Sequence, residues 1–380
     1  MKRIITILIF ILIAVGCSKS LIFRSELINQ KSYDQFGNTP QRNFYYPISI
    51  SDSLVELWRT SGYGSNTNTS VTIYSDILFS PELAGNIVGF NLLNGNEVGA
   101  KKEKGEIAHA VVVDRMRIIF CINEAKGNYG RLFFYDFIKG ETIKVIEVFG
   151  GISNELIKLN DGIIALSDFG EVVKYDFLGN VIWNTKTKSL TLTDPASNGN
   201  MTYFANSKNQ VIAVFNSDGK IVFQKEFEHP FESGISIFDE KIYLADNKGK
   251  MFCLDEKTGE EIWKFSSSAK VIMTPILDDK NIYFGNLNGD YYSLSKYDGS
   301  LNWHTQSNGM FNATGLVFEN YLLQPDVNKS LLIINKSNGV IKNRVSYEQR
   351  VRMSPVFYRD MIFVGIDHGE IIAYRPEFLK

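Results

Sequence analysis

The chain has 380 residues, of which 40 are lysine or arginine and 42 are aspartate or glutamate, so its formal net charge is only −2. No basic stripe accompanies this balance, which makes nucleic acid a poor candidate partner. Contact with a membrane is therefore expected to come from a covalent lipid.

The first residues have the features of a secretory lipoprotein signal. Two basic residues precede a predominantly apolar run over residues 4–15, which is shorter than a membrane span requires. The run ends in the sequence AVGC at residues 14–17, which resembles the bacterial lipobox. We therefore predict a signal peptide over residues 1–16 and lipidation of Cys17. An ordinary signal peptide with a chance cysteine is the alternative.

The residues after the signal differ in composition from the rest of the chain. Residues 18–46 show no convincing periodicity and contain many Asn, Gln, Ser and Gly residues, which is typical of a linker. We predict a tether over residues 17–46 and a single folded unit over residues 47–380. Ser18 is non-acidic, and in lipoproteins of many diderm bacteria such a residue goes with delivery to the outer membrane.

A glycine recurs about every forty residues through the folded unit, with gaps of 45, 39, 40, 40, 40 and 40 residues. Between these glycines lie short runs rich in Ile, Val, Tyr and Phe that are punctuated by Gly, Asn and Asp, as expected of strands and turns. A period near forty with four strands per unit is typical of a propeller blade. The glycines are Gly95, Gly140, Gly179, Gly219, Gly259, Gly299 and Gly339.

The two ends of the chain predict how the repeats close. The last repeat provides three strands and then ends, whereas Leu54–Arg59 looks like a fourth strand with no repeat before it. We predict that this N-terminal strand completes the C-terminal blade, which protects the sheet edges of the ring. The sequence thus predicts an all-β, eight-bladed β-propeller of four-stranded antiparallel blades, expected to be monomeric.

An aromatic residue recurs at one point of the repeat. Three tryptophans lie four residues after a turn glycine, the fourth takes the matching place in the N-terminal strand, and Phe223 takes it in another unit. One large ring at a fixed point of each blade predicts packing between neighbouring sheets. A cofactor-stacking box would instead need the rings to converge on one site. The tryptophans are Trp58, Trp183, Trp263 and Trp303.

One stretch of the repeat resembles a known family. The run Cys253-x-Asp255-x-x-Thr258-Gly259-x-x-x-Trp263 is similar to the tryptophan-docking motif of the pyrroloquinoline-quinone-like repeat family, Ala-x-Asp-x-x-Thr-Gly-Lys-x-x-Trp, and departs from it only at the alanine and the lysine. Residues 35–42, QFGNTPQR, resemble the lead-in before the first strand of many members. The resemblance extends from about Tyr33 to the C-terminus and implies eight blades closed by an N-terminal strand.

The family includes quinone-dependent alcohol and sugar dehydrogenases, for which the resemblance implies a vicinal cysteine pair, a bound calcium ion and an aspartate base. This chain has no adjacent cysteines, and Cys121 and Cys253 belong to different units, where small buried packing is expected. Its four histidines lack the paired spacing of a metal site and are expected to be solvated or at strand ends. We predict no catalytic, cofactor-binding or metal-binding residues. A quinone-dependent dehydrogenase, or a receptor for a ligand or glycan, is the alternative.

The longest departure from the repeat lies in one loop, where the gap of 45 residues accommodates about five extra residues. Loops that depart from a rigid repeat are candidate contact sites, with a tolerated insertion as the alternative. The connections over residues 185–198 and 304–312 are predicted to point toward the same rim. The candidate partner residues of the loop are Asn123, Glu124, Lys126, Asn128 and Tyr129.

The chain resembles the BamB-like branch of this family, the lipoproteins of the outer-membrane β-barrel assembly machinery. The resemblance rests on the lipobox, the short tether, the eight blades and the missing cofactor residues. The resemblance implies a lipid-anchored scaffold whose loops dock on the periplasmic domains of the barrel-inserting protein and help to present incoming chains. The expected location is the bacterial cell envelope, anchored to the outer membrane and facing the periplasm. The contact residues of that branch cannot be matched to positions in this chain.

Overall fold

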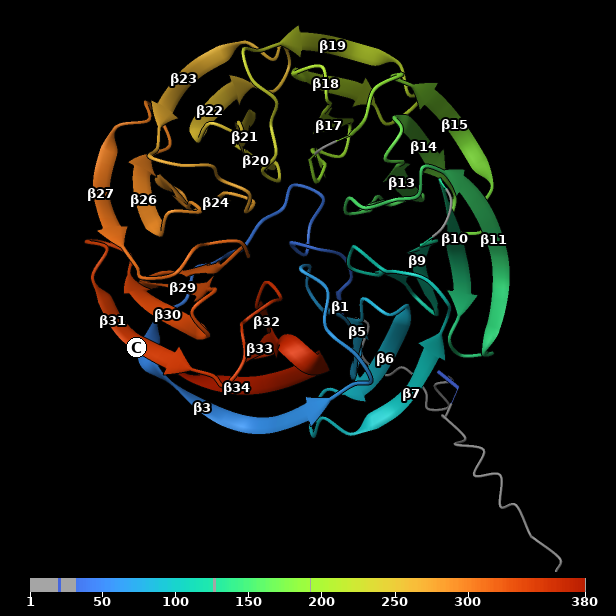
Figure 1. Ribbon diagram of the computed structural model, residues 1–380, viewed down its shortest axis with the longest axis horizontal. Helices are drawn as coiled ribbons and strands as arrows, with labels where there is room; N and C mark the ends of the chain where they lie inside the picture. Colours follow the sequence, from blue (N-terminus) through green and yellow to red (C-terminus); the bar gives the residue numbers. More distant parts are fainter. Residues whose placement is uncertain (1–19, 22–31, 126–127, 192, 380) are drawn as a thin grey trace, which may run out of the picture.

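A computed structural model describes residues 20–21, 32–125, 128–191 and 193–379. The described residues form eight sheets arranged in a ring around one axis (Figure 1). Almost all of their regular structure is strand, apart from one 3-10 turn, η1 (Asp367–Gly369). The predicted all-β, eight-bladed propeller is therefore confirmed. Within these stretches, no helix is long and apolar enough to cross a membrane.

Each blade has four strands, A to D, that run from the axis outward, and blades are numbered here in chain order. The strands of blades 1 to 4 are β4 (Thr72–Tyr74), β5 (Ile77–Pro81), β6 (Asn86–Asn91), β7 (Glu97–Lys102); β8 (Val112–Asp114), β9 (Arg117–Asn123), β10 (Tyr129–Asp136), β11 (Glu141–Phe149); β12 (Ile157–Lys158), β13 (Ile163–Leu166), β14 (Glu171–Tyr175), β15 (Val181–Lys186); and β16 (Ala196–Ser197), β17 (Met201–Ala205), β18 (Gln210–Phe215), β19 (Ile221–Glu226).

The same order continues around the second half of the ring. The strands of blades 5 to 8 are β20 (Ser236–Phe238), β21 (Lys241–Ala245), β22 (Lys250–Asp255), β23 (Glu261–Ser266); β24 (Ile276–Leu277), β25 (Asn281–Gly285), β26 (Asp290–Ser295), β27 (Leu301–Gln306); β28 (Leu316–Phe318), β29 (Tyr321–Asp326), β30 (Ser330–Asn335), β31 (Ile341–Ser346); and β32 (Val356–Tyr358), β33 (Met361–Ile366), β34 (Glu370–Phe378), β3 (Ile50–Ser61).

The ring closes as the sequence predicts. Strand β3 pairs antiparallel with β34, so the outermost strand of blade 8 comes from the N-terminal part of the chain. Figure 1 shows this blue strand lying outside the red C-terminal strand at the bottom of the ring. Closure by a strand from the other end of the chain joins the first and last blades without leaving an unpaired seam.

The C–D turns explain the recurring glycines. In blade 5, the Asp255 carboxylate accepts bonds from the backbone N–H groups of Lys257 and Thr258, at 3.0 and 2.8 Å. Gly259 then adopts a φ of 71°, in the left-handed region that favours glycine. An acidic or amide residue followed by a glycine therefore builds the tight connection between the two outer strands of a blade.

The recurring aromatic rings lie between neighbouring blades. Each ring covers the turn glycine of the next blade, where a side chain would collide with it, and the indole Nε1 of each tryptophan donates to a nearby backbone carbonyl at 2.9–3.1 Å. Burial of so large a ring at this position in five of the eight blades stabilises the contact between neighbouring sheets. The pairs are Trp58 with Gly95, Trp183 with Gly219, Phe223 with Gly259, Trp263 with Gly299 and Trp303 with Gly339.

The N-terminal segment departs from the expected tether over residues 17–46. Residues 32–48, called the strap here, lie inside the ring and supply two extra strands, β1 (Ser32–Tyr33) and β2 (Tyr45–Tyr46). The strap contacts several blades one after another, so its side chains follow no single face and leave no period in the sequence. Cys17, the predicted site of lipidation, lies outside the described residues.

Candidate functional site

The strap covers the inner edge of the ring. The A strands nearest the axis would otherwise present unpaired N–H groups, which are expensive to bury. Four strap carbonyls accept bonds from A-strand N–H groups at the same repeat position in blades 2, 4, 5 and 7. The pairs are Val113 with Asp34 (2.8 Å), Ser197 with Pro40 (2.7 Å), Ile237 with Gln41 (3.0 Å) and Val317 with Phe44 (3.0 Å). The strap therefore connects blades that are far apart in the chain.

Residues just before the A strands link several neighbouring blades. The N–H of Thr314 in blade 7 donates to the Ser354 hydroxyl of blade 8 at 3.0 Å. In the other half of the ring, the N–H of Ala110 donates to the Glu155 carboxyl at 3.0 Å, and the N–H of Glu155 donates to the Asp194 carboxyl at 2.9 Å. Blades 3 and 4 thus place carboxyl groups where blades 7 and 8 have threonine and serine.

The guanidinium group of Arg42 fixes the strap beside these carboxyl groups. Arg42 is 2% exposed. It donates to the backbone carbonyls of Pro195 at 3.0 Å, Phe36 at 2.5 Å and Leu156 at 3.1 Å. One side chain of the strap therefore joins its own segment to blades 3 and 4, and its charge is held in a region that excludes water.

Burial dominates the titration of this cluster. Burial and, after it, the charge of Asp194 raise the pKa of Glu155, whereas the charge of Arg42 lowers it, and the net result is a pKa of about 8. Burial also raises the pKa of Asp194 and lowers that of Arg42. The Thr69 hydroxyl contacts the Glu155 carboxyl from blade 1. The strap and the buried cluster of Arg42, Glu155 and Asp194 are together called the hub here. Protonation of Glu155 leaves one charge fewer buried away from solvent in the hub.

The raised pKa predicts how stability depends on pH. Between the ordinary pKa of glutamate, 4.5, and about 8, the folded state holds a proton on Glu155 that the unfolded state has lost. The free energy of unfolding is therefore expected to fall as pH rises through this window, by at most about 1.4 kcal/mol per pH unit for one proton. Glu155→Gln should flatten the slope in urea unfolding, whereas Glu260→Gln, an exposed control, should leave it unchanged. Equal slopes in Glu155→Gln and the wild type would contradict this assignment.

The hub does not fit a quinone with calcium. The carboxyl groups of Glu155 and Asp194 already accept backbone N–H bonds, and the fixed cation of Arg42 beside them would repel a calcium ion. Among the residues that the structure describes, no three or more His, Cys, Asp or Glu side chains are grouped to hold a metal ion. The strap, meanwhile, occupies the inner edge of the blades.

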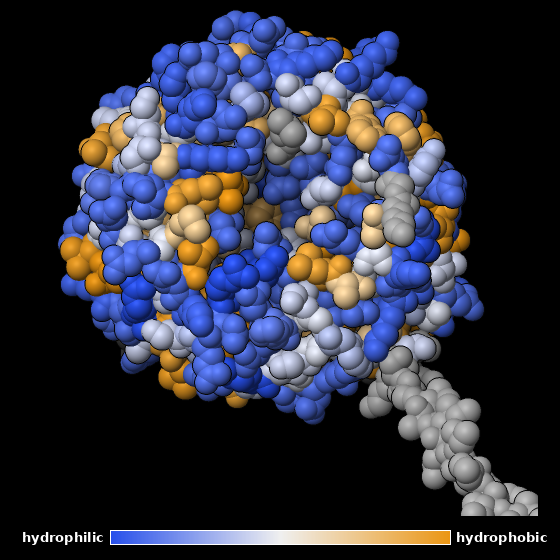
Figure 2. Space-filling view, in the orientation of Figure 1, coloured by the Kyte–Doolittle hydropathy of each residue, from blue (hydrophilic) through white to orange (hydrophobic). Residues whose placement is uncertain are grey.

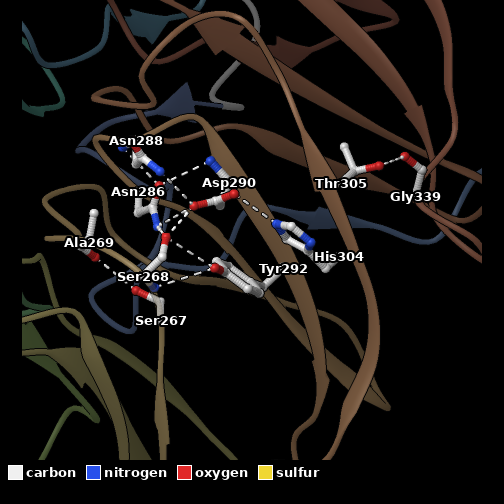
Figure 3. Close-up of polar contacts among 10 residues, drawn as sticks. All are labelled: Ser267, Ser268, Ala269, Asn286, Asn288, Asp290, Tyr292, His304, Thr305 and Gly339. Carbon is white, nitrogen blue, oxygen red and sulfur yellow. Dashed lines mark hydrogen bonds and ion pairs between the residues drawn. The ribbon is translucent and has the colours of Figure 1, made fainter.

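A second polar cluster lies where the B–C turn of blade 6 meets the D–A connection from blade 5 (Figure 3). The Asp290 carboxylate accepts a bond from His304 Nε2 at 2.9 Å and also contacts the Ser268 hydroxyl. His304 stacks on Tyr292 with ring centroids 4.9 Å apart. In a hydrolytic triad the histidine lies between hydroxyl and carboxylate. Here the carboxylate lies between the other two, so the Ser268 hydroxyl bonds to Asp290 rather than to the histidine, and the cluster holds two loops together.

The predicted partner loop lies on the face that carries the B–C and D–A connections. The side chain of Asn123, at the end of β9, exchanges bonds with both backbone groups of Ile152, both at 2.9 Å, which shows an internal role. Glu124 forms an ion pair with Arg131 at 3.3 Å. The carbonyl of Asn128 accepts from Gly150 at 2.5 Å. Lys126 lies outside the described residues.

Tyr129 belongs to an exposed aromatic cluster that includes Phe149 and Phe169. The Tyr129 and Phe149 rings lie 5.4 Å apart, and the Phe149 and Phe169 rings 5.0 Å apart. The three residues are 50%, 48% and 37% exposed. Large apolar rings grouped at a rim are typical of contact sites. They come from two blades, which is why the loop sequence alone showed only Tyr129.

The expected solvated or strand-end histidine is wrong for His109. This residue is fully buried, its Nε2 accepts a bond from the N–H of Cys121 at 3.2 Å, and its Nδ1 donates to the Ala110 carbonyl at 2.8 Å. Burial lowers the pKa of His109 to about 4, so the ring is neutral and acts as a structural link. Cys121 and Cys253 are free and buried, in different blades.

Arg42, Glu155 and Asp194 were missed as site residues, although the sequence holds a signal for two of them. Glu155 and Asp194 occupy the repeat position that is Thr314 in blade 7 and Ser354 in blade 8. An acidic residue at a position held elsewhere by small hydroxyl residues marks a departure from the repeat. Arg42 had no such signal, because the strap does not repeat.

Comparison with known proteins gives a family and a fold. Residues 149–230 and 208–375, together more than half of the chain, match the model of a family described as Outer membrane protein assembly factor BamB. The protein of that name from Xanthomonas campestris pv. campestris is 25% identical over 148 residues, which is 39% of this chain and 34% of that protein. This chain therefore aligns with about a third of that relative's length.

Two solved structures show the same fold. BamB from Moraxella catarrhalis superposes with a TM-score of 0.71 at 14% identity, over 85% of this chain and 100% of that one. Quinohemoprotein alcohol dehydrogenase from Comamonas testosteroni superposes with a TM-score of 0.74 at 10% identity, over 90% of this chain and 80% of that one. Because BamB and the alcohol dehydrogenase superpose on this chain with similar TM-scores, the likeness establishes the fold alone.

Proposed function

Because the chain belongs to the family of Outer membrane protein assembly factor BamB, we propose that it is a non-catalytic scaffold of outer-membrane protein assembly. It binds other proteins through the loops of its B–C and D–A face. Its partner is the β-barrel assembly machinery, and the periplasmic domains of the barrel-inserting protein are the surface on which its loops dock.

The observation that carries this proposal is that the strap covers the inner strands of the ring. The strap bonds to A strands of blades 2, 4, 5 and 7 and is fixed by the buried Arg42. A propeller whose inner strands are covered by its own chain offers partners its rims and loops. Figure 2 shows that the face seen down the axis is mostly hydrophilic, with apolar residues in separate patches, as expected of a surface that binds partners reversibly.

The proposal includes the membrane anchor. A lipid on Cys17, which becomes the N-terminus when residues 1–16 are removed, holds the ring at the outer membrane on the periplasmic side. The propeller over residues 47–380 acts as a monomer. The four tryptophans, Trp58, Trp183, Trp263 and Trp303, serve to dock blade on blade and take no part in binding partners.

Affinity capture tests the partner. Full-length protein is purified from solubilised outer membranes, and the expected result is recovery of the β-barrel assembly proteins. The pair of substitutions Tyr129→Ser and Phe149→Ser should reduce this recovery several-fold, because it removes the exposed rings of the aromatic cluster. Tyr297→Ser, which removes a 60% exposed ring from a C–D turn, is the matched control. Recovery of unrelated proteins only would overturn the proposal.

A ligand receptor is the second candidate, favoured by one open cavity of about 990 Å³. It lies between the strap and the A–B and C–D connections of blades 3 and 4, and its wall includes Lys158 and Lys174. Both lysines form ion pairs with aspartates, Asp34 at 2.5 Å and Asp161 at 2.7 Å. Reconstitution with pyrroloquinoline quinone and calcium, followed by a dye-linked assay on alcohols and aldoses, tests the other alternative, a quinone-dependent dehydrogenase. Turnover would favour the enzyme.

A further inference from the structure

Blade 1, like blades 2 and 7 with Lys144 and Asn343, lacks the aromatic ring that the other five blades use for docking. At the repeat position of Trp183, Trp263 and Trp303, four residues after the turn glycine, it has Gly99. Gly99 pairs across the sheet with a second glycine, Gly89. Two facing glycines leave an empty slot on the outside of blade 1, next to blade 2.

A short N-terminal segment fills this slot. Ser20 and Leu21, called the latch here, lie against the outer strand β7 of blade 1 (Figure 1), with a parallel bridge between Ser20 and Ala100. A Cβ atom on Gly99 would lie 2.6 Å from the Ser20 carbonyl oxygen, and one on Gly89 would lie 2.6 Å from Leu21 Cδ1. The two glycines therefore admit the latch where any side chain would exclude it.

The latch is buried and hydrogen-bonded to blades 1 and 2. Leu21 is 1% exposed and packs in the apolar cluster between blades 1 and 2. Its N–H donates to the Ala100 carbonyl at 3.2 Å, and its carbonyl accepts from the Tyr135 hydroxyl of blade 2 at 3.1 Å. Leu21 thus docks blade 1 on blade 2 as a tryptophan docks other pairs of blades. It buries an apolar side chain between them and forms a hydrogen bond to the next blade.

The latch shortens the connection to the predicted anchor. Only two residues separate Cys17 from Ser20, so their Cα atoms can be at most about 11 Å apart, from about 3.6 Å per extended residue. The bridge is parallel to β7, which runs away from the C–D turn of blade 1. Ser20 therefore lies on the side of Leu21 that faces the C–D turns.

The C–D turns next to the latch are apolar. The turns of blades 1 to 3 carry Leu93, Ile138 and Leu178, of which Leu93 and Leu178 are 66% and 48% exposed. Blade 6 carries Tyr297, and the corresponding turns of blades 4, 5 and 7 carry Ser217, Lys257 and Ser337. Exposed aliphatic side chains on tight turns suit the boundary between lipid headgroups and acyl chains.

We propose that the latch clamps the lipidated N-terminus to the rim between blades 1 and 2, so that the C–D turns of blades 1 to 3 rest on the bilayer. The opposite face, with the B–C and D–A loops, then points away from the membrane and is free to bind partners. This orientation rests on the proposed lipidation of Cys17, but not on the identity of any protein partner.

Quenching by labelled lipid tests the orientation. Full-length lipoprotein is reconstituted in vesicles of phosphatidylethanolamine and phosphatidylglycerol that contain a brominated lipid, and single cysteines carry a fluorophore. Leu93→Cys in blade 1 and Lys257→Cys in blade 5 occupy the same turn position, two residues before the glycine, and Lys208→Cys reports on the opposite face. The native cysteines, Cys121 and Cys253, are buried and do not compete for the label. Quenching at Leu93→Cys is expected to exceed that at the other two sites several-fold.

A variant of the latch provides the second readout. Leu21→Glu places a charge in the apolar slot and should release the latch, so that quenching at Leu93→Cys and Lys257→Cys becomes similar. Equal quenching at the two turns in otherwise wild-type protein, or an unchanged difference in Leu21→Glu, would overturn the proposal. Flotation with the vesicles separates the two premises, because protein that fails to float lacks the anchor, whereas floating protein with equal quenching lacks only the clamp.

Discussion

Replacing Trp263 with alanine is expected to lower the free energy of unfolding by about 3–5 kcal/mol, the usual cost of truncating a buried large aromatic side chain. The Trp263 ring is 7% exposed, covers Gly299 of the next blade and lies 6.0 Å from the Tyr243 ring. Its Nε1 donates to the Lys296 carbonyl at 3.0 Å. The change therefore leaves a cavity between blades 5 and 6 and removes the shorter of two hydrogen bonds to the Lys296 carbonyl, which still accepts from the Tyr243 hydroxyl at 3.5 Å.

Guanidinium unfolding followed by circular dichroism measures this loss. Trp263→Phe is the matched control, because Phe223 naturally covers Gly259 from blade 4. Phenylalanine keeps most of the ring contact and loses the hydrogen bond, so its cost should be nearer to about 1 kcal/mol. A loss for Trp263→Ala no greater than that for Trp263→Phe would show that the ring does not hold the two blades together.

The fold was predictable because each blade repeats the same local physics. The glycine of the C–D turn returns about every forty residues, and an Asx residue four positions before it and a ring four positions after it are each present at four of the seven turn glycines. Each of these features has one structural role. Strand β3 could be assigned because it had the pattern of a D strand without a preceding repeat. A structural feature that repeats can therefore be recognised in a single sequence without an alignment.

The strap and the latch could not be predicted, because each occurs once. The strap bonds to the A strands through backbone carbonyls, which every residue has. These contacts therefore require no particular side chains, and the composition of the strap could not be distinguished from that of a linker. Gly99 could have been noticed as a glycine at the position of a docking tryptophan. The residue that fills its slot, Leu21, nevertheless lies 78 residues away in the sequence (99 − 21) and carries no mark of its own.

The largest effect on the hub is expected from Arg42→Met, which should lower the free energy of unfolding by about 3–5 kcal/mol, as for other broken buried charge pairs. Methionine fills part of the volume but leaves the carbonyls of Phe36, Pro195 and Leu156 without their donor. It also removes the cation that lowers the pKa values of Glu155 and Asp194. Urea unfolding measures the loss, and Arg350→Met, at an arginine whose side chain is 58% exposed, should cost little.

Hydrogen exchange distinguishes release of the strap from general loss of stability. If Arg42 is what holds the strap, Arg42→Met should speed exchange at the N–H groups of Ile237 and Val317, which bond to strap carbonyls, more than at the N–H groups within the outer strands. The double variant Arg42→Met with Glu155→Gln should regain part of the lost stability only at pH values above the raised pKa of Glu155, where the glutamate would be charged and glutamine stays neutral. Uniform exchange across each blade would show that the strap stays bound without the guanidinium, and that the hub depends on its backbone bonds alone.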